Sequence, residues 1–209
     1  MSLEHLLALS SFAFVAAVTP GPNNTMLLAS GLNFGFARTV PHIVGINIGF
    51  PVMVLLIGLG VGQLFAAEPR LFTALKIIGV FYLLWLAWRI ANSTPSGIED
   101  AGSPNSRPLG FIGAAAFQWV NPKAWIIAIG ALATYGIKGE PVWSALIIAT
   151  VYSAVGFASS SIWAAFGTGL RRILSEPSHQ RAFNVAMALI LVASLWPAIA
   201  DLFPRLRLG

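Results

Sequence analysis

The sequence predicts an all-α, polytopic membrane protein with six transmembrane helices that form two inverted three-helix repeats. Three observations lead to this prediction. Of the 209 residues, 57% are hydrophobic and 9% are charged, whereas a soluble domain has roughly 25% charged residues. Six apolar segments are each long enough to cross a bilayer, which takes about 20 residues. Two of them, the first and the fourth, are interrupted by proline motifs.

The first repeat is expected to cover residues 1–92, with spans at about 6–32, 40–65 and 71–90. The first span is interrupted at 20–24, because two prolines and a glycine remove helical hydrogen bonds there. Thr19 is expected to cap the second half of that span. Gly45 and Gly49 in the second span have a spacing that lets another helix approach closely.

A polar segment at 93–108 is expected to connect the repeats, since it has three prolines, two glycines and no apolar periodicity. The second repeat, 109–209, has spans at about 109–137, 142–170 and 182–203, with a basic loop at 171–181. The fourth span is interrupted at 121–123. A slight excess of Arg in the loops after the first, third and fifth spans favours a cytoplasmic location for these loops, with both termini outside.

The two halves share weak internal similarity. The segment Gly21-Pro22-Asn23 corresponds to Asn121-Pro122-Lys123 at an offset of 100 residues. At an offset of 111, Gly45 and Gly49 correspond to Gly156 and Ser160, and Trp85 corresponds to Trp196. Because each repeat has an odd number of spans, the second copy must enter the membrane from the opposite side. Many secondary transporters have this architecture, with the binding site where the copies meet.

The two interruptions are expected to face each other and to form the site. Backbone groups freed by proline need partners in hydrocarbon, so a broken helix is tolerated only inside protein or beside a polar cavity. The candidate residues are Thr19, Pro20, Gly21, Pro22, Asn23 and Asn24 at the first break, Gln118, Asn121, Pro122 and Lys123 at the second, and Gly45, Asn47 and Gly49 in the second span. The amides either bind a polar solute or only satisfy the freed backbone, and the sequence leaves both open.

Lys123 is the only charged residue near the middle of an expected span. A central Lys costs roughly 2.5–3.5 kcal/mol on membrane-insertion scales, so it normally lines a cavity or has a partner. Since every Asp and Glu lies in a loop or at the end of a span, Lys123 is expected to receive a substrate carboxylate or to exchange a proton. The alternative is that the fourth span starts later and Lys123 extends to the head groups. His42 is expected at the interface, and the serines at 159–161 are expected to pack helices.

Several function classes are disfavoured. The chain has no cysteine, no spacing of metal ligands and no nucleotide-binding glycine motif, so we expect no cofactor, no metal and no enzymatic activity. The net charge of +5 is spread over the ends of apolar segments, which is typical of membrane topology and not of nucleic-acid binding.

The chain resembles the LysE/RhtB family of amino-acid exporters, also called LysE-type translocators. The resemblance rests on Thr19-Pro20-Gly21-Pro22-Asn23, on the glycine pair Gly45 and Gly49, and on Asn121-Pro122-Lys123-Ala124-Trp125. It implies export of amino acids or related carboxylated metabolites across the bacterial inner membrane, commonly driven by protons. The implied partners are a small amino-acid-like substrate, the coupling ion and the lipid bilayer, and a homo-oligomer is left open.

The chain departs from the family in one place. Members often carry an acidic residue just after the glycine pair, where this sequence has Phe50-Pro51. The departure disfavours a basic substrate and a carboxylate proton relay, and a neutral or acidic solute suits a site whose one charge is Lys123. Two alternatives stay open, namely efflux of another small solute and a membrane assembly protein that does not transport.

Overall fold

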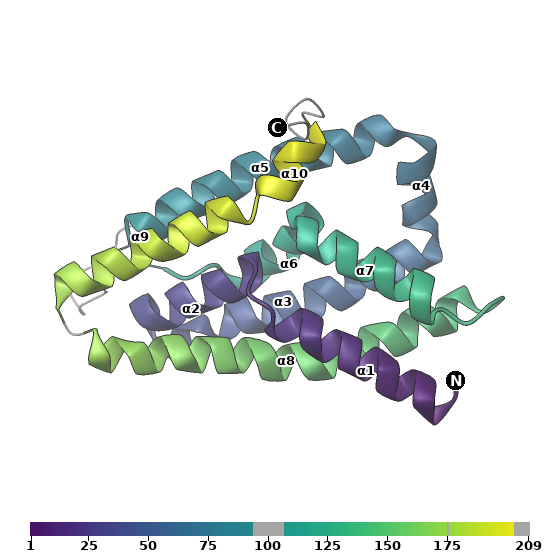
Figure 1. Ribbon diagram of the computed structural model, residues 1–209, viewed down its shortest axis with the longest axis horizontal. Helices are drawn as coiled ribbons and strands as arrows, with labels where there is room; N and C mark the ends of the chain where they lie inside the picture. Colours follow the sequence, from purple (N-terminus) through teal and green to yellow (C-terminus); the bar gives the residue numbers. More distant parts are fainter. Residues whose placement is uncertain (94–106, 175, 203–209) are drawn as a thin grey trace.

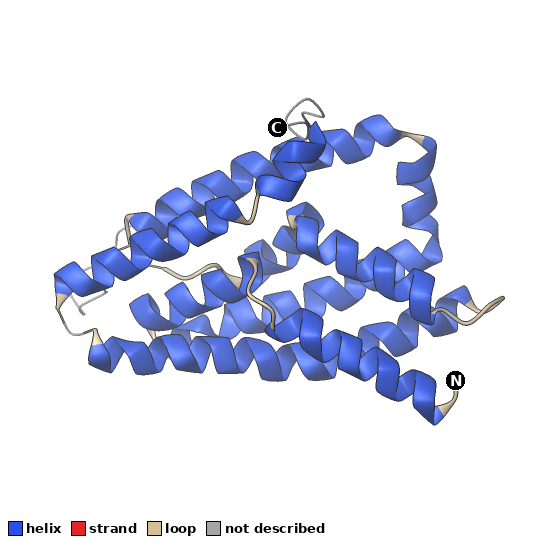
Figure 2. Cartoon of the chain, viewed as in Figure 1, coloured by secondary structure: helices blue, strands red, loops and turns tan. Residues whose placement is uncertain are grey.

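The computed structural model describes residues 1–93, 107–174 and 176–202. Over these ranges the chain is helical and contains no strand (Figure 2). The elements are α1 (Leu3–Val18), α2 (Pro22–Phe34), α3 (Phe36–Leu56), a π-helical segment η1 (Ile57–Val61), α4 (Gly62–Ala67), α5 (Pro69–Ala91), α6 (Phe111–Val120), α7 (Pro122–Tyr135), α8 (Pro141–Ile173), α9 (Pro177–Ala193) and α10 (Trp196–Leu202).

Four helical segments of the described ranges are long and apolar enough to cross a membrane: Phe36–Phe65, Pro69–Ala91, Pro141–Ile173 and Pro177–Ala200. The pair α1 and α2, bent by 53° at its break, makes a fifth if it counts as one span. The chain is therefore a multi-pass membrane protein. The residues of the expected fourth span form α6 and α7, of 10 and 14 residues, each shorter than the length of about 20 residues that a span requires. They are not among the membrane-span candidates, so the sixth expected span is not confirmed.

Both helix breaks are shorter than the sequence suggested. The first was expected at 20–24, but α2 begins at Pro22, so Asn23 and Asn24 lie in its first turn. The second was expected at 121–123, but α7 begins at Pro122 and only Asn121 lies outside the helices. The reason is the same at both sites. Proline suits the first position of a helix, where its missing N–H has no intrahelical partner anyway.

Other boundaries also moved. The basic loop expected at 171–181 is short, because α8 continues to Ile173 and α9 begins at Pro177. The expected span at 182–203 is divided into α9 and α10. The connecting segment expected at 93–108 lies mostly outside the described residues, since 94–106 are not described.

Close helix packing brings the two halves of the chain together (Figure 1). Helix α8 packs along α2 and α3, α6 packs against α3, and α5 runs beside α9. A Cβ at Gly31 or Gly167 would overlap backbone of the facing helix in the α2–α8 contact, so both positions require glycine. Gly45 and Gly49 have the close-packing role that their spacing predicts, against α6.

Two apolar clusters flank the helix breaks. One joins α1, α3, α7 and α8, with Leu9, Met53, Trp125 and Ile148 fully or almost fully buried. The other joins α2, α5, α6 and α9. Large apolar side chains such as Ile112 and Ile173 are exposed on the outer surface, as expected for a surface that faces lipid.

Candidate functional site

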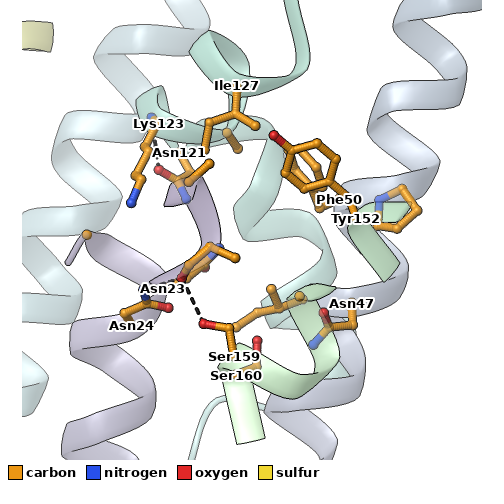
Figure 3. Close-up of a pocket in the computed structure, with 17 residues that line it drawn as sticks. Asn23, Asn24, Asn47, Phe50, Asn121, Lys123, Ile127, Tyr152, Ser159 and Ser160 are labelled. Atoms are coloured by element: carbon orange, nitrogen blue, oxygen red, sulfur yellow. Dashed lines mark hydrogen bonds between the residues drawn. The ribbon is translucent and has the colours of Figure 1, made fainter. Parts of the chain in front are cut away.

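A pocket lies beside the first helix break, between α1, α2, α3, α7 and α8 (Figure 3). Its cavity volume is about 80 Å³. Its lining combines small residues, amides, hydroxyls, two aromatic rings and one cation. The residues are Ala16, Ala17, Gly21, Asn23, Asn24, Ile46, Asn47, Phe50, Pro51, Asn121, Lys123, Ala124, Ile127, Tyr152, Gly156, Ser159 and Ser160.

At the first break, side chains satisfy carbonyl groups at the end of α1. The amide nitrogen of Asn24 donates to the carbonyl oxygens of Ala17 (2.8 Å) and Thr19 (3.0 Å). Ser159 of α8 also donates to Ala17 (2.8 Å). Thr19 does not cap α2 as expected. It ends α1, and its hydroxyl donates back to the carbonyl of Val15, because the chain turns away before α2 begins.

At the second break, Asn121 caps α7. Its side-chain oxygen accepts a hydrogen bond from the backbone N–H of Lys123 (3.1 Å). The Lys123 side chain then crosses to the first break, where its ammonium group donates to the carbonyl oxygens of Thr19 (2.6 Å) and Pro20 (3.5 Å). The two breaks are therefore in direct contact through this one side chain.

Gly21 leaves the space that Lys123 occupies. A Cβ at Gly21 would lie 2.8 Å from Cδ of Lys123 and 3.1 Å from its ammonium nitrogen. The backbone of Gly21 is extended (φ −177°) and suits any residue. Glycine is thus needed here for room and not for conformation.

The charge of Lys123 is not balanced by an acid. In the described ranges no carboxylate lies within ion-pair distance of its ammonium group, and none of the pocket-lining residues is acidic. The side chain is half-buried, and its partners are neutral carbonyl groups. A cation held in this way has the capacity to bind an anionic group that enters the pocket.

Two further amides are held in fixed orientations. Asn23 and Gln118 form a reciprocal pair, with N–O distances of 2.9 and 3.2 Å, and Gln118 also donates to the carbonyl of Ala114 (2.9 Å). Asn47 donates to the carbonyl of Ile43 in its own helix (2.8 Å), while a Cβ at Gly156 would lie only 2.6 Å from its side-chain oxygen. Glycine at 156 therefore makes room for this amide at the pocket wall.

The sequence profile of the family described as LysE type translocator matches residues 14–194. The chain belongs to this family. It is therefore a transport protein and not an enzyme.

Curated relatives of this LysE type translocator are named cysteine/O-acetylserine efflux protein. One from Klebsiella pneumoniae is 32% identical over 188 residues, which cover 89% of this chain and 93% of the relative. Relatives from Salmonella typhimurium and Escherichia coli strain K12 are 30% and 29% identical, each with coverage of 90% and 93%. No solved structure matches the chain.

Most of the residues that the sequence singled out lie at the pocket of this LysE type translocator. Gly21, Asn23, Asn24, Asn47, Asn121 and Lys123 line it. Thr19 and Pro20 supply the carbonyls that hold Lys123, Pro22 and Pro122 begin α2 and α7, and Gln118 holds Asn23 from behind. Gly45 and Gly49 do not line the pocket, because they face α6.

Sequence reasoning missed the wall formed by α8 and the aromatic residues. Phe50 of α3 and Tyr152 of α8 line the pocket with ring centroids 5.1 Å apart. Ser159 and Ser160, expected only to pack helices, also line it. The internal repeat could have indicated that α8 lines the pocket, since Gly156 and Ser160 correspond to the glycine pair of the second span.

Proposed function

We propose that this translocator is a secondary exporter of small neutral amino acids or related carboxylated metabolites across the bacterial inner membrane. The observation that carries the proposal is the cation of Lys123, placed where the two helix breaks meet, in a pocket whose lining has no acid. We propose the residues at the two breaks, together with Asn47, as the binding site.

The carboxylate of the substrate is assigned to Lys123 and the neighbouring helix starts. Helices α2 and α7 both begin beside the pocket, and their N-cap residues Gly21 and Asn121 line it. The N-terminal end of a helix attracts negative charge. Charge-assisted hydrogen bonds from Lys123 would add to this attraction. To bind the carboxylate, the ammonium group exchanges its present carbonyl partners for carboxylate oxygens.

A neutral side chain suits the rest of the pocket. The side-chain oxygen of Asn47 and the hydroxyls of Ser159 and Ser160 in α8 accept hydrogen bonds from the substrate amino group. The lining has no carboxylate to pair with a second positive charge, which disfavours lysine or arginine as substrates. The relatives named for cysteine and O-acetylserine efflux support this preference, since neither solute has a positively charged side chain.

We further propose six spans in two inverted repeats, 1–92 and 109–209, connected by 93–108. Each repeat begins with a broken helix, continues with a long helix (α3 or α8) and ends with α5 or with α9 and α10. The elements that would be equivalent also pack on each other, α3 on α8 and α5 on α9. Alternating movement of the two repeats around the site would move the solute, with protons as the coupling ion.

Counterflow in proteoliposomes that contain only the purified protein tests the proposal. Vesicles loaded with an unlabelled amino acid are expected to accumulate labelled O-acetylserine, cysteine or another neutral amino acid, and a pH gradient is expected to drive net movement. Basic amino acids are expected to give little counterflow. If no member of a broad panel of amino acids exchanges, the protein instead transports another small solute or serves membrane assembly.

A further inference from the structure

The hydroxyl of Tyr152 has no part in the carboxylate binding proposed for Lys123. The Tyr152 side chain in the middle of α8 is 5% exposed, and its hydroxyl oxygen is buried without a hydrogen-bond partner. Most buried side-chain polar atoms have a partner, so an unpaired one calls for an explanation. The ring lies at the pocket, against Phe50.

The Tyr152 ring lies across the pocket from Lys123 (Figure 3). In Figure 3, Lys123 and Asn24 lie on one side of the pocket, and Phe50 and Tyr152 lie on the other side. The Tyr152 hydroxyl is at the edge of the ring that faces Ile127. An amino acid with its carboxylate at Lys123 would therefore extend its side chain toward the two rings.

We propose that Tyr152 selects the side chain of the substrate through a hydrogen bond from its hydroxyl. The preferred substrates are small neutral amino acids with a hydroxyl, thiol or ester group, and Phe50 limits their length. This inference rests on the proposed export function and names the substrate class of the same site. A site built to bond a polar group discriminates against analogues that lack it, because its own polar group is then left unpaired.

Tyr152→Phe isolates this hydrogen bond, since it removes only the hydroxyl and keeps the ring. Counterflow is measured in proteoliposomes for two pairs of similar size, cysteine (kept reduced) against 2-aminobutyrate and threonine against valine. We expect the variant to lower the ratio of polar to apolar transport by about 2- to 10-fold, which is the value of one hydrogen bond. Transport of 2-aminobutyrate and valine is expected to stay within about twofold of wild type.

Tyr82→Phe is the matched control. Tyr82 of α5 packs against Trp85 and Phe117 and does not line the pocket, so removal of its hydroxyl is expected to leave both ratios unchanged. A second measurement needs no variant. In the wild-type protein, threonine is expected to inhibit transport of labelled cysteine more strongly than valine does.

The outcomes separate this inference from the proposed function. Amino-acid counterflow with equal ratios in wild type and Tyr152→Phe overturns the role of Tyr152 and leaves the export function in place. Equal inhibition of the wild type by threonine and valine has the same meaning, even if the variant does not insert. Absence of counterflow with every amino acid overturns the export function, and the role of Tyr152 falls with it.

Discussion

The ammonium nitrogen of Lys123 lies 2.6 Å from the carbonyl oxygen of Thr19, so the cation of one helix break is bound to the backbone of the other. In a continuous helix the carbonyl of Thr19 would accept from the N–H group four residues later. The break ends that pattern, and Lys123 and Asn24 take over as donors. In the proposed site, a substrate carboxylate at Lys123 would compete with this contact, which would couple substrate binding to the geometry of both breaks.

Lys123→Gln is expected to lower amino-acid efflux by about 10- to 100-fold, because a hydrogen bond to a charged group contributes about 1.5–3 kcal/mol. The amount of protein in the membrane is expected to stay similar, since the neutral amide can still donate to the carbonyls of the first break. Efflux from cells with matched expression measures the effect. Lys138→Gln, at an exposed position outside this pocket, is the control. If Lys123→Gln exports amino acids at the wild-type rate, Lys123 does not bind the substrate.

Gly21→Ala is expected to reduce transport several-fold with little loss of stability. The new methyl group would lie 2.8 Å from Cδ of Lys123 and would displace that flexible side chain from the first break. The extended backbone of Gly21 accepts alanine, so we expect a change in the free energy of unfolding below about 1 kcal/mol. Efflux and thermal unfolding in detergent measure the two effects.

Gly169→Ala provides the comparison for Gly21→Ala. A Cβ at Gly169 meets no atom within 4 Å, and alanine favours the helix at this position. Efflux and thermal stability are therefore expected to stay the same or to rise slightly. Equal efflux from Gly21→Ala and Gly169→Ala would show that the space above Gly21 does not matter for transport.

The pair formed by Asn23 and Gln118 is expected to couple α2 to α6 energetically. Asn23→Leu removes one partner of the buried Gln118 amide, which keeps its bond to Ala114, and Gln118→Leu removes the partner of the half-buried Asn23 amide. Each variant is expected to cost up to about 1–3 kcal/mol. The double variant is expected to lose less than the sum of the single variants, by about 0.5–3 kcal/mol. Unfolding in detergent gives the four stabilities of the cycle.

A second cycle tests whether this coupling is specific. Thr150 is exposed on α8 and bonds only within its own helix, so Thr150→Val shares no partner with Asn23. The effects of Asn23→Leu and Thr150→Val are expected to add within about 0.5 kcal/mol. Additive losses for Asn23→Leu and Gln118→Leu as well would mean that the observed amide pair contributes no coupling.

The sequence was informative about the breaks because their cause is local. Proline removes an N–H wherever it stands, so helices 1 and 4 of the expected fold had to end near Pro20 and Pro122. The prediction of the residue at which each helix restarts was wrong. Proline was treated only as a helix breaker, although it is also a good first residue of a helix. The reach of Lys123 could not be deduced, since it depends on the space above Gly21 in the other half of the chain.

The aromatic wall was not found for a different reason. Phe50 and Tyr152 lie in long apolar helices, where aromatic residues that face lipid and those that face a pocket have the same composition and spacing. Only the contact of α3 with α8 decides which face is inside. The predicted position of His42 was wrong for the same reason. It was expected at the interface near Arg38, but its face of α3 is turned inward and the side chain is 1% exposed.

His42→Leu is expected to raise the thermal stability of the protein or to leave it unchanged. Both ring nitrogens of His42 are buried without hydrogen-bond partners, in a second pocket that Ser30 and Asn33 of α2 also line. An unpaired buried polar group costs free energy, whereas an apolar side chain in the same space does not. Thermal unfolding in detergent measures the change.

Asn33→Leu is the opposite case in the same pocket and serves as its control. Asn33 forms a reciprocal amide pair with Asn184, with N–O distances of 2.8 and 2.9 Å. Its replacement leaves the side-chain oxygen of Asn184 without a partner, although the amide nitrogen still donates to the carbonyl of Ser93. The change is expected to cost about 1–3 kcal/mol. A loss of this size from His42→Leu as well would mean that the imidazole has a stabilising partner, which contradicts the unpaired nitrogens. Higher stability together with lower efflux would mean that His42 is retained for transport, at a cost to the fold.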